Sequence, residues 1–144
     1  MEFNDTVRIH VPPSPKIGQN VSLLCEWGWN EEDKQITFYK KTRENGSNDS
    51  VCLIHMNASH VQTKVETQTY INRIKLPNNQ SFVKGVIIQL LKISLQDDGL
   101  YFCEVEITDQ NTIITGKMKQ MEVKGERRKR RKKKCIVLDI NLRN

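Results

Sequence analysis

The sequence predicts an all-β fold in which two antiparallel sheets pack face to face as a Greek-key sandwich. Apolar and polar residues alternate with the two-residue period of half-buried strands, most clearly in residues 7–11, 21–25 and 101–107. Prolines and glycines separate these runs, as turn residues do. A further observation is the run Asp97-Asp98-Gly99-Leu100-Tyr101-Phe102-Cys103, which places a glycine and a tyrosine shortly before a cysteine.

The run from Asp97 to Cys103, with Cys25 far upstream, resembles the D-x-G-x-Y-x-C motif of immunoglobulin V-type domains. In such domains the tyrosine two positions before the second cysteine bonds through its hydroxyl to the backbone and closes the corner between strands E and F. The resemblance gives that role to Tyr101, and Gly99 suits a turn with a positive φ. An immunoglobulin-like sandwich implies an extracellular binding protein rather than an enzyme.

Asp97 is expected to lie half-buried at this corner, where an ionised carboxylate needs a cationic partner to offset its desolvation. We predict that Arg73, at the start of a strand D, supplies that cation in a structural ion pair. The alternative interpretation is that Asp97, Asp98 and Gly99 form only a polar turn.

The first strands follow the order of such a sandwich. Residues 7–11 predict an edge strand, which the prolines in residues 12–15 interrupt because proline has no amide to donate to a ladder. This break resembles the switch from strand A to strand A′. Residues 21–25 predict strand B, and residues 36–40 predict strand C with Phe38 at the core position that antibody-like domains fill with tryptophan. The chain's two tryptophans lie too close in sequence to the strand B cysteine to take that position.

The second half begins with strand C′ at residues 51–54, while residues 58–72 receive no assignment. The run Asp109-Gln110-Asn111 predicts a hairpin turn, because these residue types tolerate left-handed backbone. Residues 113–123 predict strand G, with Met118 where V-type domains carry the second glycine of a bulge. Inward positions of strands E and F are Ile88, Leu90, Ile93, Tyr101, Cys103, Val105 and Ile107.

The length of 144 residues suits one V-type sandwich of roughly 100 to 120 residues with an appendage. We assign residues 1–125 to the domain and residues 126–144 to a basic tail, which like-charge repulsion is expected to keep disordered. No apolar run reaches the length of about 18 residues that a membrane span needs. The first residues lack the pattern of a signal peptide, so we expect a mature chain that begins with an initiator methionine.

The net charge of +6 is unevenly distributed. Residues 126–144 hold nine of the 23 Lys and Arg and two of the 17 Asp and Glu, so residues 1–125 carry 14 basic against 15 acidic residues. The domain is therefore close to neutral, and arguments for anionic partners concern the tail alone. We expect no nucleic-acid partner.

Six asparagines begin Asn-x-Ser/Thr, the acceptor sequence for N-glycosylation. They are Asn4, Asn20, Asn45, Asn48, Asn57 and Asn79. Because chance predicts only about one or two such matches among 12 asparagines, the excess predicts a secreted or cell-surface glycoprotein. None of them falls in the last two strands, so glycans are expected to leave the F–G hairpin bare.

The four cysteines allow three full pairings. The immunoglobulin resemblance selects Cys25 with Cys103, a disulfide whose loop closure stabilises the fold by roughly 4 to 5 kcal/mol. Cys52 is then either a small buried apolar residue or half of a second bridge. Cys135 sits where a stalk cysteine would join two chains by an intermolecular disulfide. None of these cysteines has the spacing of a zinc site, so we expect no metal and no cofactor.

A narrower resemblance lies in the runs Val51-Cys52-Leu53-Ile54-His55-Met56-Asn57-Ala58-Ser59 and Leu100-Tyr101-Phe102-Cys103-Glu104-Val105-Glu106-Ile107. Together with Phe38, they resemble the T-cell costimulatory receptors, in which a strand C′ cysteine precedes a glycosylation sequence and the strand C tryptophan is commonly missing. That family has a second disulfide partner near residues 71–74 and three prolines after strand F. This chain has no cysteine at residues 71–74 and no proline at residues 108–112. Natural-killer activating receptors have a similar C-x-V-E-V pattern, with Ile107 in the last position of this chain, and are the related alternative.

The tail contains eight consecutive basic residues, 127–134. We interpret them first as the cytosolic flank of a membrane segment, because receptors of this type place basic residues on that side. An alternative splice that omits the segment would join the run directly after Gly125. A polyanion-binding arm, a nuclear signal and a processing site remain alternatives.

An enzyme is not expected, because His10, His55 and His60 lie apart without a nucleophile or metal spacing. The leading hypothesis is an immune cell-surface receptor ectodomain that binds a cell-surface protein ligand through its G-F-C-C′ face. Alternatives are a soluble decoy or matrix-associated factor whose tail binds anionic glycans, and a homophilic adhesion module. Since loops at the end of a rigid sandwich commonly carry recognition, the predicted ligand-binding residues are Glu104, Glu106, Thr108, Asp109, Gln110, Asn111 and Thr112.

Overall fold

The computed structural model describes residues 7–28, 34–41, 50–57, 62–64, 70, 72–77, 80 and 84–125. Its strands are β1 (Val7–His10), β2 (Val21–Trp27), β3 (Lys34–Lys41), β4 (Ser50–Asn57), β5 (Gln62–Lys64), β6 (Ile74–Lys75), β7 (Gly85–Leu90), β8 (Gly99–Ile107), β9 (Thr112–Thr115) and β10 (Lys119–Met121), and its 3-10 turns are η3 (Leu95–Asp97) and η4 (Thr108–Gln110). The predictions for Asn4, Asn45, Asn48, Asn79, Cys135 and the tail at 126–144 lie outside the described residues. The domain boundary after residue 125 therefore stays a prediction.

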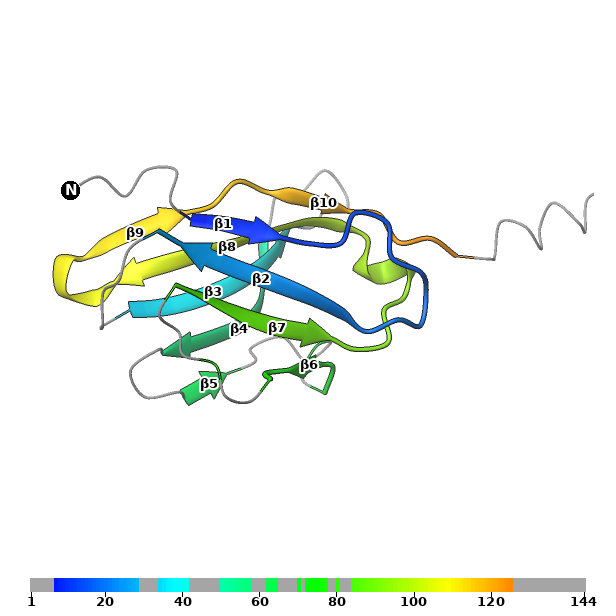
Figure 1. Ribbon diagram of the computed structural model, residues 1–144, viewed down its shortest axis with the longest axis horizontal. Helices are drawn as coiled ribbons and strands as arrows, with labels where there is room; N and C mark the ends of the chain where they lie inside the picture. The colour runs from blue at the N-terminus through cyan, green and yellow to red at the C-terminus, as the bar shows by residue number, and fades with distance from the viewer. Residues whose placement is uncertain are drawn as a thin grey trace, which may run out of the picture.

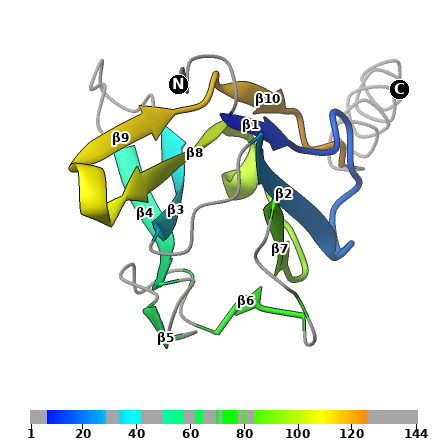
Figure 2. The same cartoon turned by 60° about the vertical axis from the view of Figure 1, so that its left-hand side comes forward.

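The strands form two sheets that pack face to face, which confirms the predicted two-sheet sandwich (Figures 1 and 2). One sheet has the order β1-β2-β7-β6, the A-B-E-D arrangement of a V-type domain. The other has the order β10-β8-β3-β4-β5, and β9 also pairs with β8. Strand F, which is β8, is thus flanked by strand C on one side and by both parts of strand G on the other.

The first strand changes sheets as predicted. β1 pairs with β2, and beyond the prolines the chain runs beside the end of strand G, where Lys16 and Lys124 form a parallel bridge. The Lys124 amide donates to the carbonyl of Pro15 at 2.8 Å, and the Ile17 amide donates to the carbonyl of Lys124 at 2.9 Å. This is the switch from A to A′, and it ties the N-terminal edge to both sheets.

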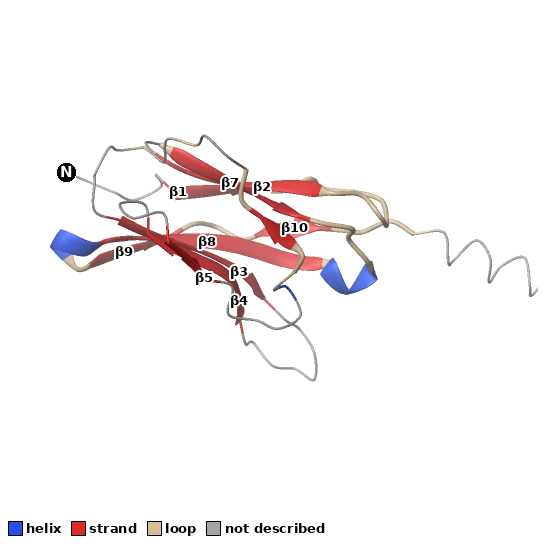
Figure 3. Ribbon diagram, turned by 90° about the horizontal axis from the view of Figure 1, so that it is seen from below, coloured by secondary structure: helices blue, strands red, loops and turns tan. Residues whose placement is uncertain are grey.

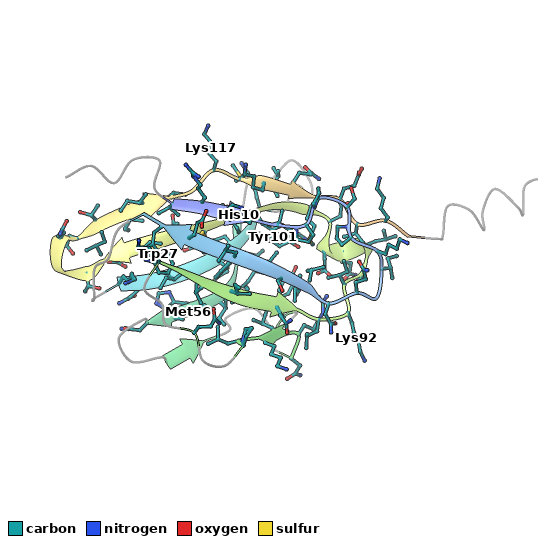
Figure 4. The ribbon with its side chains drawn as sticks, viewed as in Figure 1. His10, Trp27, Met56, Lys92, Tyr101 and Lys117 are labelled. Atoms are coloured by element: carbon teal, nitrogen blue, oxygen red, sulfur yellow. A yellow bond between two sulfur atoms is a disulfide. The ribbon has the colours of Figure 1, made fainter. Side chains whose placement is uncertain are left out.

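The core lies between the sheets and is crossed by a disulfide that joins Cys25 to Cys103, with Cα atoms 6.1 Å apart. The predicted inward residues of strands E and F are all buried. Phe38 is fully buried and lies opposite Cys103 in register, so a phenylalanine fills the usual tryptophan position. Trp27 lies further along β2, opposite Val7, and is also buried between the sheets with Tyr101 (Figure 4). It therefore adds a further large ring to the core beside Phe38 and Tyr101, and this was not predicted from the sequence.

The corner between strands E and F is built around Asp97, which is fully buried. Its carboxylate accepts two hydrogen bonds from the Arg73 guanidinium, at 2.5 and 3.1 Å, and a third from the Ser94 amide at 2.8 Å. The hydroxyl of Tyr101 donates to the Asp97 carbonyl. The pKa of Arg73 is raised, first because of its hydrogen bond to Asp97. Gly99, with φ +153°, then turns the chain into β8.

Strand G differs from the prediction. The single strand expected over residues 113–123 is wrong at its centre, because the structure divides it into β9 and β10 with a break at residues 116–118. At this break the chain approaches β1 so closely that a Cβ on Gly116 would lie 3.0 Å from the Val7 carbonyl oxygen. The Gly116 amide still donates to the carbonyl of Cys103 at 2.9 Å, so the two parts stay on the same edge of β8.

The corner generates a stability prediction. Replacing Arg73 with Met leaves the buried Asp97 carboxylate without its cation, so we expect the free energy of unfolding to fall by about 3–5 kcal/mol. The matched control is Arg8→Met on β1, where the residue is exposed, and its effect should stay within about 0.5 kcal/mol. Denaturant unfolding of both variants measures the difference. Equal losses for the two variants would show that the ion pair does not hold the corner.

Candidate functional site

The outward face of the six-stranded sheet follows from the alternation of β8. Because Tyr101, Cys103 and Val105 point into the core, the residues between them point outward. The register places Glu106 between Ile113 of β9 and Gln35 of β3, and Glu104 between Thr115 and Thr37. We call this surface the front face and define it by Gln35, Thr37, Tyr39, His55, Asn57, Phe102, Glu104, Glu106, Ile113 and Thr115.

Two stacked aromatic rings lie at the centre of the front face. Tyr39 of β3 and Phe102 of β8 are neighbours in register, with ring centroids 4.9 Å apart and ring planes inclined by 15°. A β-bulge between Phe38 and Tyr39 shifts the pairing of β3 with β4 at this point, so that Cys52 lies opposite Tyr39. Both rings are half-exposed. The stack is therefore an accessible apolar surface at the centre of a largely polar face.

Hydrogen bonds join the polar side chains around this stack. The Thr37 hydroxyl and the Nδ1 of His55 lie 2.7 Å apart, and the Thr115 hydroxyl donates to Glu104 at 3.0 Å. The Tyr39 hydroxyl also donates a hydrogen bond to the Glu104 carboxylate. Burial first, and then the charge and hydrogen bond of Glu104, raise the pKa of Tyr39 to about 12. Tyr39 is thus a neutral donor at physiological pH.

The hairpin that joins strands F and G lies at one end of the front face, and the two 3-10 turns lie at opposite ends of β8 (Figure 3). Asn111 adopts the left-handed conformation, with φ 50°, as expected for a turn asparagine. The Thr112 hydroxyl donates to the carbonyl of Gln110 at 3.0 Å. In Figure 1 this hairpin lies at the opposite end of the sandwich from the orange segment that follows β10.

The six predicted ligand-binding residues whose side chains are described fall into three groups. Glu104 and Glu106 are half-exposed on the front face, whereas Thr108, Gln110 and Asn111 are exposed on the hairpin. Thr112 lies opposite Ile107, which points into the core, so Thr112 is on the inward side of the sheet and is not part of the front face. For Asp109 only the backbone is described.

The aromatic centre of the front face was not predicted from the sequence. Phe102 stands between Tyr101 and Cys103, so alternation alone turns it outward, and Tyr39 is in the same position beside Phe38. Two outward aromatic residues on neighbouring strands were the signal available. Their stacking was not foreseeable, because it depends on the register between β3 and β8.

The two described sequons lie on different surfaces. Asn20 is exposed immediately before β2 of the other sheet, where its Oδ1 accepts a hydrogen bond from the Lys92 amide at 2.9 Å. Asn57 lies opposite Gln35, and Gln35 in turn lies opposite Glu106, so these three residues form one line across the front face. Two strand spacings of about 4.8 Å each separate it from Glu106. A glycan on Asn57 would therefore cover the C′ side of the front face and leave the F–G side open.

Within the described residues, no cluster of three or more His, Cys, Asp or Glu is arranged to hold a metal ion. The same part of the chain contains no helix that is long and apolar enough to cross a membrane. Comparison with known families shows that residues 12–124 match the model of the immunoglobulin V-set domain. No curated protein matches the chain.

The tyrosines generate a prediction of pH dependence. The chain has three, and the pKa is raised to about 12 for Tyr39 and Tyr70 and is also raised for Tyr101, in each case chiefly by burial. These pKa values in the folded domain exceed the value of about 10 that tyrosine has in the unfolded chain. The contribution of the tyrosines to the free energy of unfolding is therefore fully present below about pH 10, and it is lost as the pH rises through about 12.

Tyrosinate absorbance and circular dichroism, followed together in an alkaline titration, test this. We expect no tyrosine to ionise near pH 10 while the domain is folded, whereas all three should do so in denaturant. The control is Tyr39→Phe, which should remove one of the three ionisations without loss of the fold. A tyrosine that ionises near pH 10 in the folded domain would contradict the burial described above.

Proposed function

Because the chain belongs to the immunoglobulin V-set family, whose members are usually extracellular binding modules, we propose that it is the ligand-binding domain of an immune cell-surface receptor. The proposed receptor is of the costimulatory or co-inhibitory type, with the natural-killer activating type as the related alternative. Its ligand is a cell-surface protein that binds the front face and the hairpin at residues 108–112.

The observation that supports this proposal is the half-exposed Tyr39–Phe102 stack, surrounded by hydrogen-bonded polar side chains. Protein interfaces concentrate binding energy in a few aromatic residues ringed by polar ones that exclude water. The front face is also fixed by the disulfide-linked core beneath it, so little ordering is needed on binding. The resemblance of strands C′ and F to costimulatory receptors supports the receptor class.

A glycan placed on the front face tests the proposed ligand site. Ile113 is 59% exposed and is followed two positions later by Thr115, so Ile113→Asn creates an N-glycosylation sequence there. We expect the added glycan to abolish the binding of multimers of the full chain to a panel of leukocytes, because it covers Glu106 and its neighbours. Flow cytometry measures the binding, and a mobility shift that glycosidase reverses confirms the glycan.

Two controls accompany this variant. Ile113→Gln removes the apolar side chain without adding a glycan, and Ile87→Asn with Gln89→Thr adds a glycan to the other sheet, where Ile87 is 37% exposed. Both should bind like the unmodified chain. Undiminished cell binding by glycosylated Ile113→Asn would refute the front face as the ligand site.

A second candidate function rests on the eight basic residues at 127–134. A secreted form that carries them would act as a soluble decoy or a matrix-associated factor held on heparan-type glycans. We expect the full chain to be retained on heparin at low salt and released steeply as salt rises, because the attraction is screened. Equal retention after glutamine replaces all eight residues would contradict this function.

A further inference from the structure

The front face carries two carboxylates that the domain itself does not neutralise. Glu104 and Glu106 are half-exposed on alternate positions of β8, about 7 Å apart along the strand. Among the described residues the ion pairs join His10 to Glu26, Arg73 to Asp97 and Lys124 to Glu122, and neither of these two carboxylates takes part.

Glu104 adjoins the stacked rings, and Glu106 lies one outward position further along β8. Glu104 accepts hydrogen bonds from the hydroxyls of Tyr39 and Thr115, and an ionised carboxylate has further lone pairs for a third donor. Ring faces of Tyr and Phe attract cations through their quadrupoles. A cation near Glu104 therefore meets a negative charge and an aromatic face together.

The residues directly opposite the two carboxylates on the neighbouring strands carry no positive charge. Glu106 is flanked by Ile113 and Gln35, and Glu104 by Thr115 and Thr37. If a second copy used the same face in a two-fold dimer, it would bring another pair of carboxylates to this surface. The charges of the front face thus complement a basic surface on a different molecule.

Resting on the function proposed above, we infer that the ligand presents an arginine that pairs with Glu104 beside the Tyr39–Phe102 stack, where Glu106 adds a second negative charge one outward position further along β8. Arginine fits better than lysine, because its planar guanidinium bonds carboxylates at two points and stacks on aromatic rings. This assigns the ligand a basic contact surface and makes the recognition of the front face electrostatic as well as apolar.

The probe for this inference is N-acetyl-arginine methylamide, compared with its uncharged citrulline counterpart, added to the ¹⁵N-labelled full chain. We expect the arginine probe to shift backbone amides of β3, β8 and β9 with saturation at about millimolar concentration, and the citrulline probe to shift them several-fold less. Glu104→Gln and Glu106→Gln should each weaken the response about two- to fivefold, as for exposed ion pairs. Glu26→Gln on the other sheet is the matched control and should leave it unchanged.

Equal responses to the two probes, responses outside the front face, or insensitivity to both glutamine variants would overturn the inference. The inference would also be overturned if the front face gave no response because the chain's own basic residues 127–134 already occupy that face. The cell-binding assay separates this inference from the proposed function. If the glycan at position 113 abolishes cell binding while Glu104→Gln and Glu106→Gln do not reduce it, the ligand site stands and the arginine contact fails.

Discussion

Because side chains alternate along a strand, β8 delivers Cys103 to the core only in a register that also turns Phe102, Glu104 and Glu106 outward. The disulfide to Cys25 fixes this register from within the core. A slip of one residue would break the disulfide and exchange the buried row for the charged one. The composition of the front face is thus a consequence of how the core is closed.

The corner before β8 fixes the same register from outside the strand. Asp97 is held by Arg73 and by the Ser94 amide, and the Tyr101 hydroxyl reaches back to its carbonyl. Since Tyr101 and Cys103 share the inward row, the corner and the disulfide hold adjacent inward positions of one strand. A surface built on such a strand needs little reorganisation to bind a partner, which favours a protein interface over an adaptable loop site.

Much of this framework could be predicted from the sequence, because local patterns encode it. The D-x-G-x-Y-x-C run indicated the sandwich, and alternation indicated which residues of strands E and F are buried. The front face was predictable only in part, since Glu104 and Glu106 follow from alternation whereas the Tyr39–Phe102 stack depends on the pairing of two distant strands. The break in strand G was missed for a similar reason, because it arises where Gly116 approaches Val7 of another sheet.

The proposed ligand-binding residues and the two predicted glycosylation sites that the structure describes fall on separate parts of the domain surface. The F–G side of the front face has no sequon, and Asn57 would place its glycan toward C′. The orange segment that follows β10 lies at the far end of the sandwich from the hairpin (Figure 1). Hydroxyl-radical footprinting of the full chain on cells that bind it tests this account most directly. The account predicts that Tyr39, Phe102 and Ile113 lose reactivity on binding while Ile87 on the other sheet keeps it. Protection of Ile87 with an unchanged front face would contradict it.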